Sequence, residues 1–261
     1  MSDNSIAFLF PGQGSQKVGM LSAARQAYDV VAETFEEASE ALGYDMWTLI
    51  ESGPQESLNL TATTQPVLLS CSVALWRAWQ AQGGAMPSIM AGHSLGEFSA
   101  LVCAGVLRFD DAVRLVRSRG EAMQSAVPVG EGAMAAIIGL GDDAINAICA
   151  DIAAADGDVV AAVNFNSPGQ VVIAGHAAAV DRAIEALKEA GAKRAMPLPV
   201  SAPFHTELMR PAGDQLSGVL ADIHVSAPDI PVVHNVHAKT ETDPTRIREL
   251  LVEQIYSPVQ W

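Results

Sequence analysis

The chain has 261 residues, of which 49% are hydrophobic and 5% aromatic, and its formal net charge is −15. It is long enough to bury one large core or two unequal ones, and its many small aliphatic residues favour helices packed on a parallel sheet over an all-β sandwich. The negative charge argues against a nucleic-acid partner, because phosphate binding needs a basic face.

The cysteines and the N-terminus bear on the compartment. Cys71, Cys103 and Cys149 lie far apart in apolar surroundings, which indicates buried thiols of a reducing compartment and predicts no metal site. Met1 to Asn4 carry an acidic residue and no basic one, unlike a signal peptide, and no apolar run reaches membrane-spanning length. We therefore expect a soluble, cytoplasmic protein that binds no membrane and no metal.

Short apolar runs alternate with helical patterns in the first half of the chain. We predict strands at 6–10 and 88–91, and helices at 28–42, 65–82, 97–103 and 109–125. Strand, helix and strand in this order predict a parallel sheet covered by helices.

The pattern changes between residues 131 and 199. We predict strands at 133–138, 159–165, 170–174 and 193–198, with helices at 142–154 and 177–190. This βαββαβ order is typical of a ferredoxin-like domain. The sequence therefore predicts a small domain over 131–199, inserted into a large domain formed by 1–130 and 200–261. The large domain then adds a helix at 207–221, a strand at 231–235 and a helix at 245–255.

The motif Gly-His-Ser-Leu-Gly at 92–96 lies where an apolar strand ends and a helical segment begins. A serine on such a turn has strained backbone geometry, and the flanking glycines remove side chains that would collide there. The turn would present the Ser94 hydroxyl as a nucleophile and direct the amide of Leu95 at a developing oxyanion. The segment from Ser94 to Glu97 also fits a capping box, which is a purely structural helix start.

A nucleophilic serine needs a base, and the chain has six histidines. His205 lies in the loop 201–206 between a predicted strand and a predicted helix, where catalytic side chains tend to be placed. His93 adjoins the serine, but a sharp turn would direct its side chain elsewhere. His176 and His224 lie at helix ends, and a metal site at His234 and His237 would lack a third ligand. The sequence favours His205 and leaves the others open.

Arg119 lies in the middle of an apolar helical face. In the helix that begins near Asp110, this face is formed by Ala112, Leu115, Val116, Gly120 and Met123. A buried guanidinium must find a partner or line a cavity, because an unpaired buried charge is costly. Arg119 is therefore part of a structural salt bridge, or a side chain whose stem packs on apolar surface while its charge reaches solvent, or a fork for a substrate carboxylate.

The glycine-rich loop at 10–16 could be mistaken for a nucleotide-binding motif. Its third glycine position is Lys17, no acidic residue ends a following strand at the expected distance, and the Gly-Lys-Ser/Thr of a phosphate loop is lacking. We therefore exclude both nucleotide motifs. Because the loop leaves the first strand, it is instead placed to present a backbone amide beside the nucleophile.

Several segments occur together in a fixed order. They are Phe-Pro-Gly-Gln-Gly-Ser-Gln at 10–16, Gly-His-Ser-Leu-Gly-Glu at 92–97, Ser-Arg-Gly at 118–120, Asn-Phe-Asn-Ser-Pro at 164–168 and Pro-Phe-His at 203–205. Together they resemble the malonyl-CoA:acyl-carrier-protein transacylases, which belong to the acyltransferases of fatty-acid and polyketide synthesis. The resemblance runs from residue 5 to residue 261. It implies an α/β-hydrolase-like parallel-sheet large domain with an inserted ferredoxin-like small domain.

The resemblance also implies the catalytic roles. Ser94 would be the nucleophile, His205 the base, and Arg119 the partner of the malonyl carboxylate. The backbone amides of Leu95 and Gln13 would form the oxyanion hole.

Further roles are carried over on the remaining motifs. A backbone carbonyl, that of Gln254, would orient the base in place of a carboxylate side chain. Asn164, Asn166 and Phe204 would contact the substrate, and a phenylalanine beside the base resembles the malonyl-selective members.

The implied reaction is malonyl transfer from malonyl-CoA to the phosphopantetheine thiol of holo acyl carrier protein, in fatty-acid biosynthesis. It needs no cofactor, since the CoA thioester is a substrate. The alternatives are a serine thioesterase or hydrolase with the same turn, an acyltransferase domain of a polyketide synthase, and a non-enzymatic acyltransferase-like module. Arg119 and the Gln13 loop argue against the hydrolase, and the presence of Ser94, His205 and Arg119 argues against the module.

The two ends of the chain give opposing indications. Family members continue past residues 256–261, so we expect the C-terminal part of the large domain to be incomplete. Met1, only four residues before the first predicted strand, favours a free-standing chain.

Overall fold

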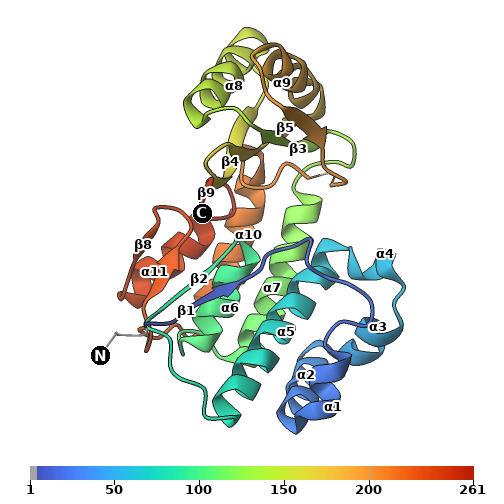
Figure 1. Ribbon diagram of the computed structural model, residues 1–261, viewed down its shortest axis with the longest axis vertical. Helices are drawn as coiled ribbons and strands as arrows, with labels where there is room; N and C mark the ends of the chain where they lie inside the picture. The colour runs from blue at the N-terminus through green and yellow to red at the C-terminus, as the bar shows by residue number, and fades with distance from the viewer. Residues whose placement is uncertain (1–4, 201) are drawn as a thin grey trace. The chain divides into compact units, whose positions relative to one another are not determined.

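The computed structural model in Figure 1 describes residues 5–200 and 202–261. Met1 to Asn4 and Ser201, which were considered above with the N-terminus and the loop before His205, lie outside the described residues. The chain divides into two compact units. The first comprises Met1–Glu121, Gly218–His234 and Lys239–Glu249, and the second comprises Ala122–Ser217, Asn235–Ala238 and Leu250–Trp261. The predicted small domain lies within the second unit, and its boundaries at residues 131 and 199 stay a prediction.

A four-stranded sheet with the order β1-β2-β7-β8 lies in the first unit. β1 (Ala7–Phe10), β2 (Ile89–Gly92) and β7 (Val232–His234) run parallel, and β8 (Lys239–Thr240) is antiparallel to β7. The predicted parallel pairing is therefore confirmed for β1, β2 and β7. Because the register pairs Phe10 with Gly92, the loop after β1 and the turn after β2 leave the sheet side by side.

The first unit contains a long series of helices before and after β2 (Figure 1). In chain order they are α1 (Ser22–Ala27), α2 (Asp29–Leu42), α3 (Met46–Ser52), α4 (Gln55–Leu58), α5 (Thr61–Ala81), α6 (Leu95–Cys103) and α7 (Phe109–Ser125). α5 begins four residues before the predicted start at Gln65, and Pro66 lies inside it. The amides of Thr63 and Thr64 bond to the carbonyl of Leu60, so the helix is already closed before the proline. Later helices are η1 (Glu207–Met209), α10 (Arg210–Ala221) and α11 (Pro244–Glu253).

A second sheet, with the order β6-β3-β5-β4-β9, lies in the second unit. Its strands are β3 (Gly132–Ile138), β4 (Val160–Ser167), β5 (Gln170–His176), β6 (Arg194–Pro197) and β9 (Val259–Gln260). All neighbours are antiparallel except β4 and β9, which are parallel. With α8 (Asp142–Asp156) and α9 (Ala177–Glu189), the elements of this segment follow the chain as strand, helix, strand, strand, helix, strand.

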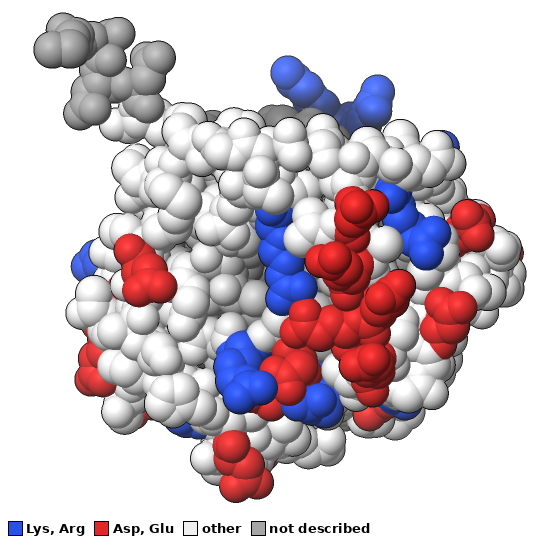
Figure 2. All heavy atoms as spheres, turned by 90° about the horizontal axis from the view of Figure 1, so that it is seen from below, with Lys and Arg blue, Asp and Glu red and all other residues white. Residues whose placement is uncertain are grey.

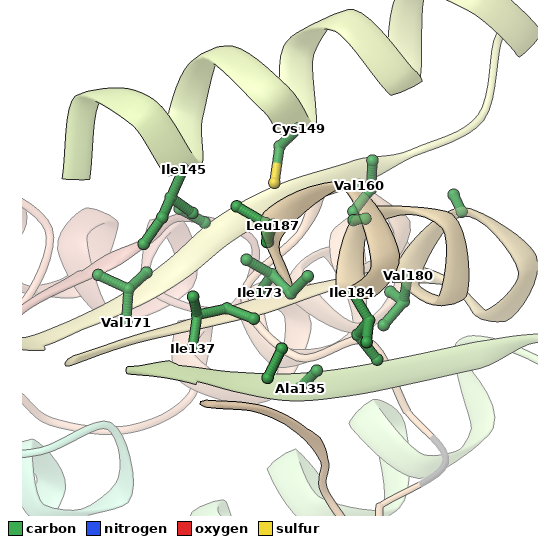
Figure 3. Close-up of a cluster of buried hydrophobic side chains, with 14 residues drawn as sticks. Ala135, Ile137, Ile145, Cys149, Val160, Val171, Ile173, Val180, Ile184 and Leu187 are labelled. Atoms are coloured by element: carbon green, nitrogen blue, oxygen red, sulfur yellow. The ribbon is translucent and has the colours of Figure 1, made fainter. Parts of the chain in front are cut away.

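Figure 3 shows the apolar core under these two helices. Ala179, Val180, Ala183, Ile184 and Leu187 recur at helical spacing on α9, so one face of that helix is buried. They pack with side chains of α8 and of the strands, including Ile137, Ile145, Cys149, Val171 and Ile173. Within residues 5–200 and 202–261, no helix is both long and apolar enough to cross a membrane.

Candidate active site

Ser94 lies at the turn from β2 into α6 and has a strained backbone with a positive φ, at φ 51° and ψ −106°. A Cβ atom at Gly92 would lie 1.9 Å from the carbonyl of Gly96, and one at Gly96 would lie 2.2 Å from the carbonyl oxygen of Phe10. Both collisions are with backbone atoms, so a side chain on either glycine would displace the main chain. The Ser94 side chain makes no capping bond to α6, which contradicts the capping-box interpretation.

Arg119 on α7 is fully buried in the first unit. Its Nη2 donates a hydrogen bond of 3.1 Å to Oγ of Ser94, and its Nη1 donates one of 2.8 Å to Oε1 of Gln65. The guanidinium carbon lies 5.1 Å from the centre of the Phe98 ring. The predicted arginine and the predicted serine are therefore in direct contact.

The Arg119 guanidinium keeps its charge despite its burial. Desolvation lowers its pKa to about 10, partly opposed by the negative charge of Glu97. A group with that pKa is protonated at neutral pH. A cation held away from water interacts strongly with an incoming anion, because little solvent screens the pair.

The loop after β1 carries Gln13, whose Oε1 accepts a hydrogen bond of 3.4 Å from Nε2 of Gln65. Gly12 lies against the Ser94 turn, since a Cβ atom there would be 2.7 Å from the carbonyl oxygen of His93. Leu95, the first residue of α6, is buried. Gln13, Gln65, Arg119 and Ser94 thus form one connected set within the first unit.

His205 lies in the second unit and also has a positive φ, of 64°. Its Nδ1 is 2.8 Å from the backbone oxygen of Gln254, and both residues are buried. A carbonyl oxygen can only accept, so Nδ1 carries the hydrogen and Nε2 of the neutral ring is the basic nitrogen. This hydrogen bond therefore selects the tautomer that a general base would need.

The three predicted substrate residues also belong to the second unit. Phe204 is buried next to His205, and Asn164 is buried in β4. Asn166, also in β4, is half-buried and lines a surface groove with Phe165 and Trp261. Among the described residues, no group of three or more His, Cys, Asp and Glu side chains could hold a metal ion.

Comparison with known proteins identifies the family. Residues 7–261 match the family model described as the acyl transferase domain. The chain is 63% identical over 256 residues to the malonyl CoA-acyl carrier protein transacylase of Salmonella typhimurium, an alignment that covers 98% of this chain and 82% of that protein. The chain belongs to this acyltransferase family. The resemblance inferred from the sequence motifs is confirmed.

Solved structures agree with this assignment. The chain superposes with a TM-score of 0.97 on the malonyl CoA-acyl carrier protein transacylase of Coxiella burnetii, at 52% identity and with coverage of 98% of this chain and 81% of that one. A malonyl-transacylase described in complex with its type II PKS acyl-carrier protein gives a TM-score of 0.96 at 56% identity, with coverage of 98% and 82%. The mixed α/β architecture is therefore that of the family.

Gln65 is a site residue that the sequence analysis missed. It is fully buried on α5 and bonds to both Arg119 and Gln13. A signal was present, because Gln65 directly precedes the apolar run at 66–69 inside a helix. A buried amide in such a run needs partners, as a buried arginine does.

A second missed feature is a buried pair formed by Glu97 and His234. Nδ1 of His234 lies 2.7 Å from Oε1 of Glu97, and both side chains are fully buried. The pair joins α6, one turn after Ser94, to the end of β7. His234 is thus a partner of a carboxylate 137 positions away in the sequence.

Proposed function

We propose that this chain transfers the malonyl group of malonyl-CoA to the phosphopantetheine thiol of holo acyl carrier protein, through a malonyl ester of Ser94. The names of its relatives support the substrate and the acceptor. Within this chain, the observation that carries the proposal is the hydrogen bond from buried Arg119 to the Ser94 hydroxyl. It places a carboxylate-binding fork beside the atom that would hold the acyl group.

In the first half-reaction Oγ of Ser94 attacks the thioester carbonyl carbon while Nε2 of His205 takes the hydroxyl proton. The amides of Leu95 and Gln13 stabilise the negative oxygen of the tetrahedral intermediate. The carbon–sulfur bond then breaks, CoA leaves as a thiol with the proton from His205, and Ser94 holds the malonyl ester.

The second half-reaction reverses these roles. The carrier thiol gives its proton to His205 and attacks the ester carbonyl carbon. When the carbon–oxygen bond breaks, the proton returns to Ser94 and the new thioester leaves. Arg119 pairs with the malonyl carboxylate throughout, and this pairing fixes the direction of the acyl chain. No cofactor enters this sequence.

Three further roles belong to the same proposal. The Gln254 carbonyl orients His205, which is supported by the 2.8 Å contact to Nδ1. Phe204 restricts the pocket to malonyl over branched acyl groups, and Asn164 and Asn166 contact the substrate.

The finer description of the fold and the location is also a proposal. We propose an α/β-hydrolase-like large domain formed by 1–130 and 200–261, with a ferredoxin-like insertion at 131–199. The strand order β6-β3-β5-β4 and the βαββαβ sequence of elements support the insertion. A reducing, cytoplasmic location is supported by three buried cysteines that form no disulfide in the described chain.

Intact mass spectrometry after addition of malonyl-CoA tests the proposal. The wild-type chain should gain one malonyl group and Ser94→Ala none. Ser99→Ala is the matched control, because it removes a hydroxyl from α6, five residues after Ser94. Equal labelling of wild type and Ser94→Ala would refute the assignment of the nucleophile.

A chase separates transfer from hydrolysis. Holo acyl carrier protein added to the labelled chain should receive the malonyl group much faster than water does. Release of free malonate at the same rate with and without the carrier would favour a hydrolase.

A further inference from the structure

The loop that carries Gln13 is tied to α4 by three side-chain amides, those of Gln16, Gln55 and Asn59, which we call the amide clamp. Oε1 of Gln16 accepts the Gly14 amide at 2.8 Å, and Nε2 of Gln16 donates to Oδ1 of Asn59 at 2.9 Å. A second arm starts on α4. Nε2 of Gln55 donates to the same Asn59 oxygen at 2.9 Å, and Oε1 of Gln55 accepts the Val18 amide at 3.0 Å.

Asn59 is the shared acceptor of the clamp. One oxygen takes both donors, which uses its two lone pairs. The backbone amide of Asn59 is in turn bonded to α4 carbonyls, so this oxygen is attached to a fixed helix end. Asn59 therefore holds the loop at two positions, at Gly14 through Gln16 and at Val18 through Gln55.

These bonds fix the direction of the Gln13 amide. Its peptide plane also contains the Gly12 carbonyl, which accepts a bond of 3.0 Å from Oγ of Ser15. The next peptide plane contains the Gly14 amide held by Gln16. Gly14 has φ 102°. Because glycine can adopt many other backbone conformations as well, the loop needs hydrogen bonds from outside to hold it in this one.

On its other side the loop is connected to the nucleophile. Gln13 accepts from Gln65, Gln65 accepts from Arg119, and Arg119 donates to Ser94. The loop is therefore held between the amide clamp and the reacting serine, with all members in the first unit.

We propose that Asn59 is a positioning residue for acyl transfer, which holds the loop so that the Gln13 amide stays directed at the thioester oxygen. This inference rests on the proposed function. Donors to an oxyanion act only when they are already oriented, and the loss of one such donor slows catalysis by about 10²–10³-fold. A loosened donor should cost part of that factor.

The role predicts a specific kinetic signature. Every CoA thioester develops the same oxyanion, so a loosened Gln13 amide should slow acylation by malonyl-CoA and acetyl-CoA equally. Displacement of the Arg119 side chain would instead slow acylation by malonyl-CoA alone. The clamp is at the surface, where water can replace its hydrogen bonds, so the thermal midpoint should change little.

The experiment compares Asn59→Leu with Asn59→Asp. Both arms donate to Asn59 and need only an acceptor, so aspartate keeps the clamp and leucine removes it. In single-turnover measurements, Asn59→Leu should slow Ser94 acylation by about tenfold or more for both thioesters, with unchanged CoA-thioester binding. Asn59→Asp should stay near the wild-type rate. Glu56→Leu is the matched control, because it places leucine on α4, three residues before Asn59 and outside the clamp.

Gln16→Met tests the clamp independently and guards against a folding defect in Asn59→Leu. It keeps the length of the side chain but removes its amide, and should slow acylation of both thioesters in the same way. Wild-type rates in both variants, or a loss confined to malonyl-CoA, would overturn the inference. Failure of the wild-type chain to become acylated would instead refute the proposed function.

Discussion

Arg119 is a buried, charged residue that lies next to Ser94, the proposed nucleophile. Its guanidinium is fully buried, charged at neutral pH and bonded to Ser94. A substrate carboxylate would form an ion pair with this guanidinium, whereas an acetyl group has no carboxylate and would form none. The proposed preference for malonyl over acetyl groups would therefore depend on this one side chain.

Replacement of Arg119 should remove the preference for malonyl-CoA. Loss of one partner of a buried ion pair typically costs about 3–5 kcal/mol, so Arg119→Ala should reduce kcat/KM for malonyl-CoA by about 10²–10³-fold or more. The reaction with acetyl-CoA should change little. Arg119→Lys should recover only part of the loss, because an ammonium cannot reproduce the planar fork. Parallel losses for the two substrates would show that Arg119 is structural.

Candidate site residues could be picked out from the sequence where a side chain is unusual for its surroundings, although their chemical roles stay a prediction. Arg119 in an apolar stripe and Ser94 between two glycines gave such signals. Glu97 and His234 gave none, since their partners come from elements far apart in the sequence. Which residues pair in this way depends on the order of strands in the sheet, and the hydrophobic periodicity of the sequence does not predict that order.

The contact between α5 and α7 depends on Gly120, the neighbour of Arg119. A Cβ atom at Gly120 would lie 2.7 Å from the carbonyl oxygen of Thr61 and from Cα of Ala62. Both are backbone atoms of α5, which also carries Gln65. The two helices can therefore approach only as closely as this glycine permits.

Gly120→Ala should push α5 away from α7 and disturb the Arg119–Gln65 bond. We expect a loss of about 1–3 kcal/mol in the free energy of unfolding, measured by urea denaturation, together with reduced malonyl selectivity. Gly218→Ala in α10 is the control, since a Cβ atom there meets nothing within 4 Å. It should be neutral or stabilising by about 0.5–1 kcal/mol. Equal effects of the two substitutions would contradict the packing argument.

The start of α3 should give stability a local dependence on pH. Asp45 accepts hydrogen bonds from the side chain and the amide of Thr48, and these bonds lower the pKa of its carboxyl group. Because this pKa is lower in the folded protein than in the unfolded chain, Asp45 stabilises the fold fully at pH values above its ordinary pKa. This stabilisation is lost as the pH falls through the pKa of the folded protein. Asp45→Ala should therefore cost about 1 kcal/mol at pH 7 and progressively less below about pH 4.

Asp45→Asn separates the cap from its charge. Asparagine keeps the acceptor oxygen but has no charge to titrate. The difference in the free energy of unfolding between Asp45→Asn and Asp45→Ala, measured by urea denaturation, should therefore not vary between pH 7 and pH 3. A constant destabilisation of Asp45→Ala over the same range would show that the carboxylate charge has no part in the cap.

Helices with a strong apolar pattern could be predicted, and the shortest helices and strands could not. α2, α7 and α9 match their predicted ranges to within one residue at each end, because an apolar face at helical spacing defines them. α1, α3 and α4 were missed, since helices this short have no complete apolar face to recognise. β8 and β9 contain two residues each, and only pairing with another strand defines them.

Charge is the property that acts on the molecule as a whole. With a net charge of −15 the chain should repel an acidic carrier protein, so docking needs a local basic patch. Figure 2 shows that acidic and basic side chains gather beside one another on a face of the molecule. Arg77 pairs with Glu37 and Lys188 with Glu185, whereas Lys193 and Arg194 are exposed at β6.

Salt should therefore weaken transfer to the carrier protein, because it screens an attraction that acts over about 10 Å. Lys193→Glu and Arg194→Glu should raise the KM for the carrier at low salt and leave Ser94 acylation by malonyl-CoA unchanged. Lys188→Glu is the control. A transfer rate that rises steadily with added salt would count against a local patch.

The tight turn around Ser94 has a genetic consequence. A side chain at Gly12, Gly92 or Gly96 would collide with main-chain atoms of His93, Gly96 and Phe10, respectively. A collision with a side chain can be relieved when that neighbour mutates to a smaller residue, but no second mutation shortens a carbonyl group. Selection for restored activity after Gly92→Ala or Gly96→Ala should thus return the original glycine codon and yield no intragenic suppressors, unlike selection after substitutions in the α9 core.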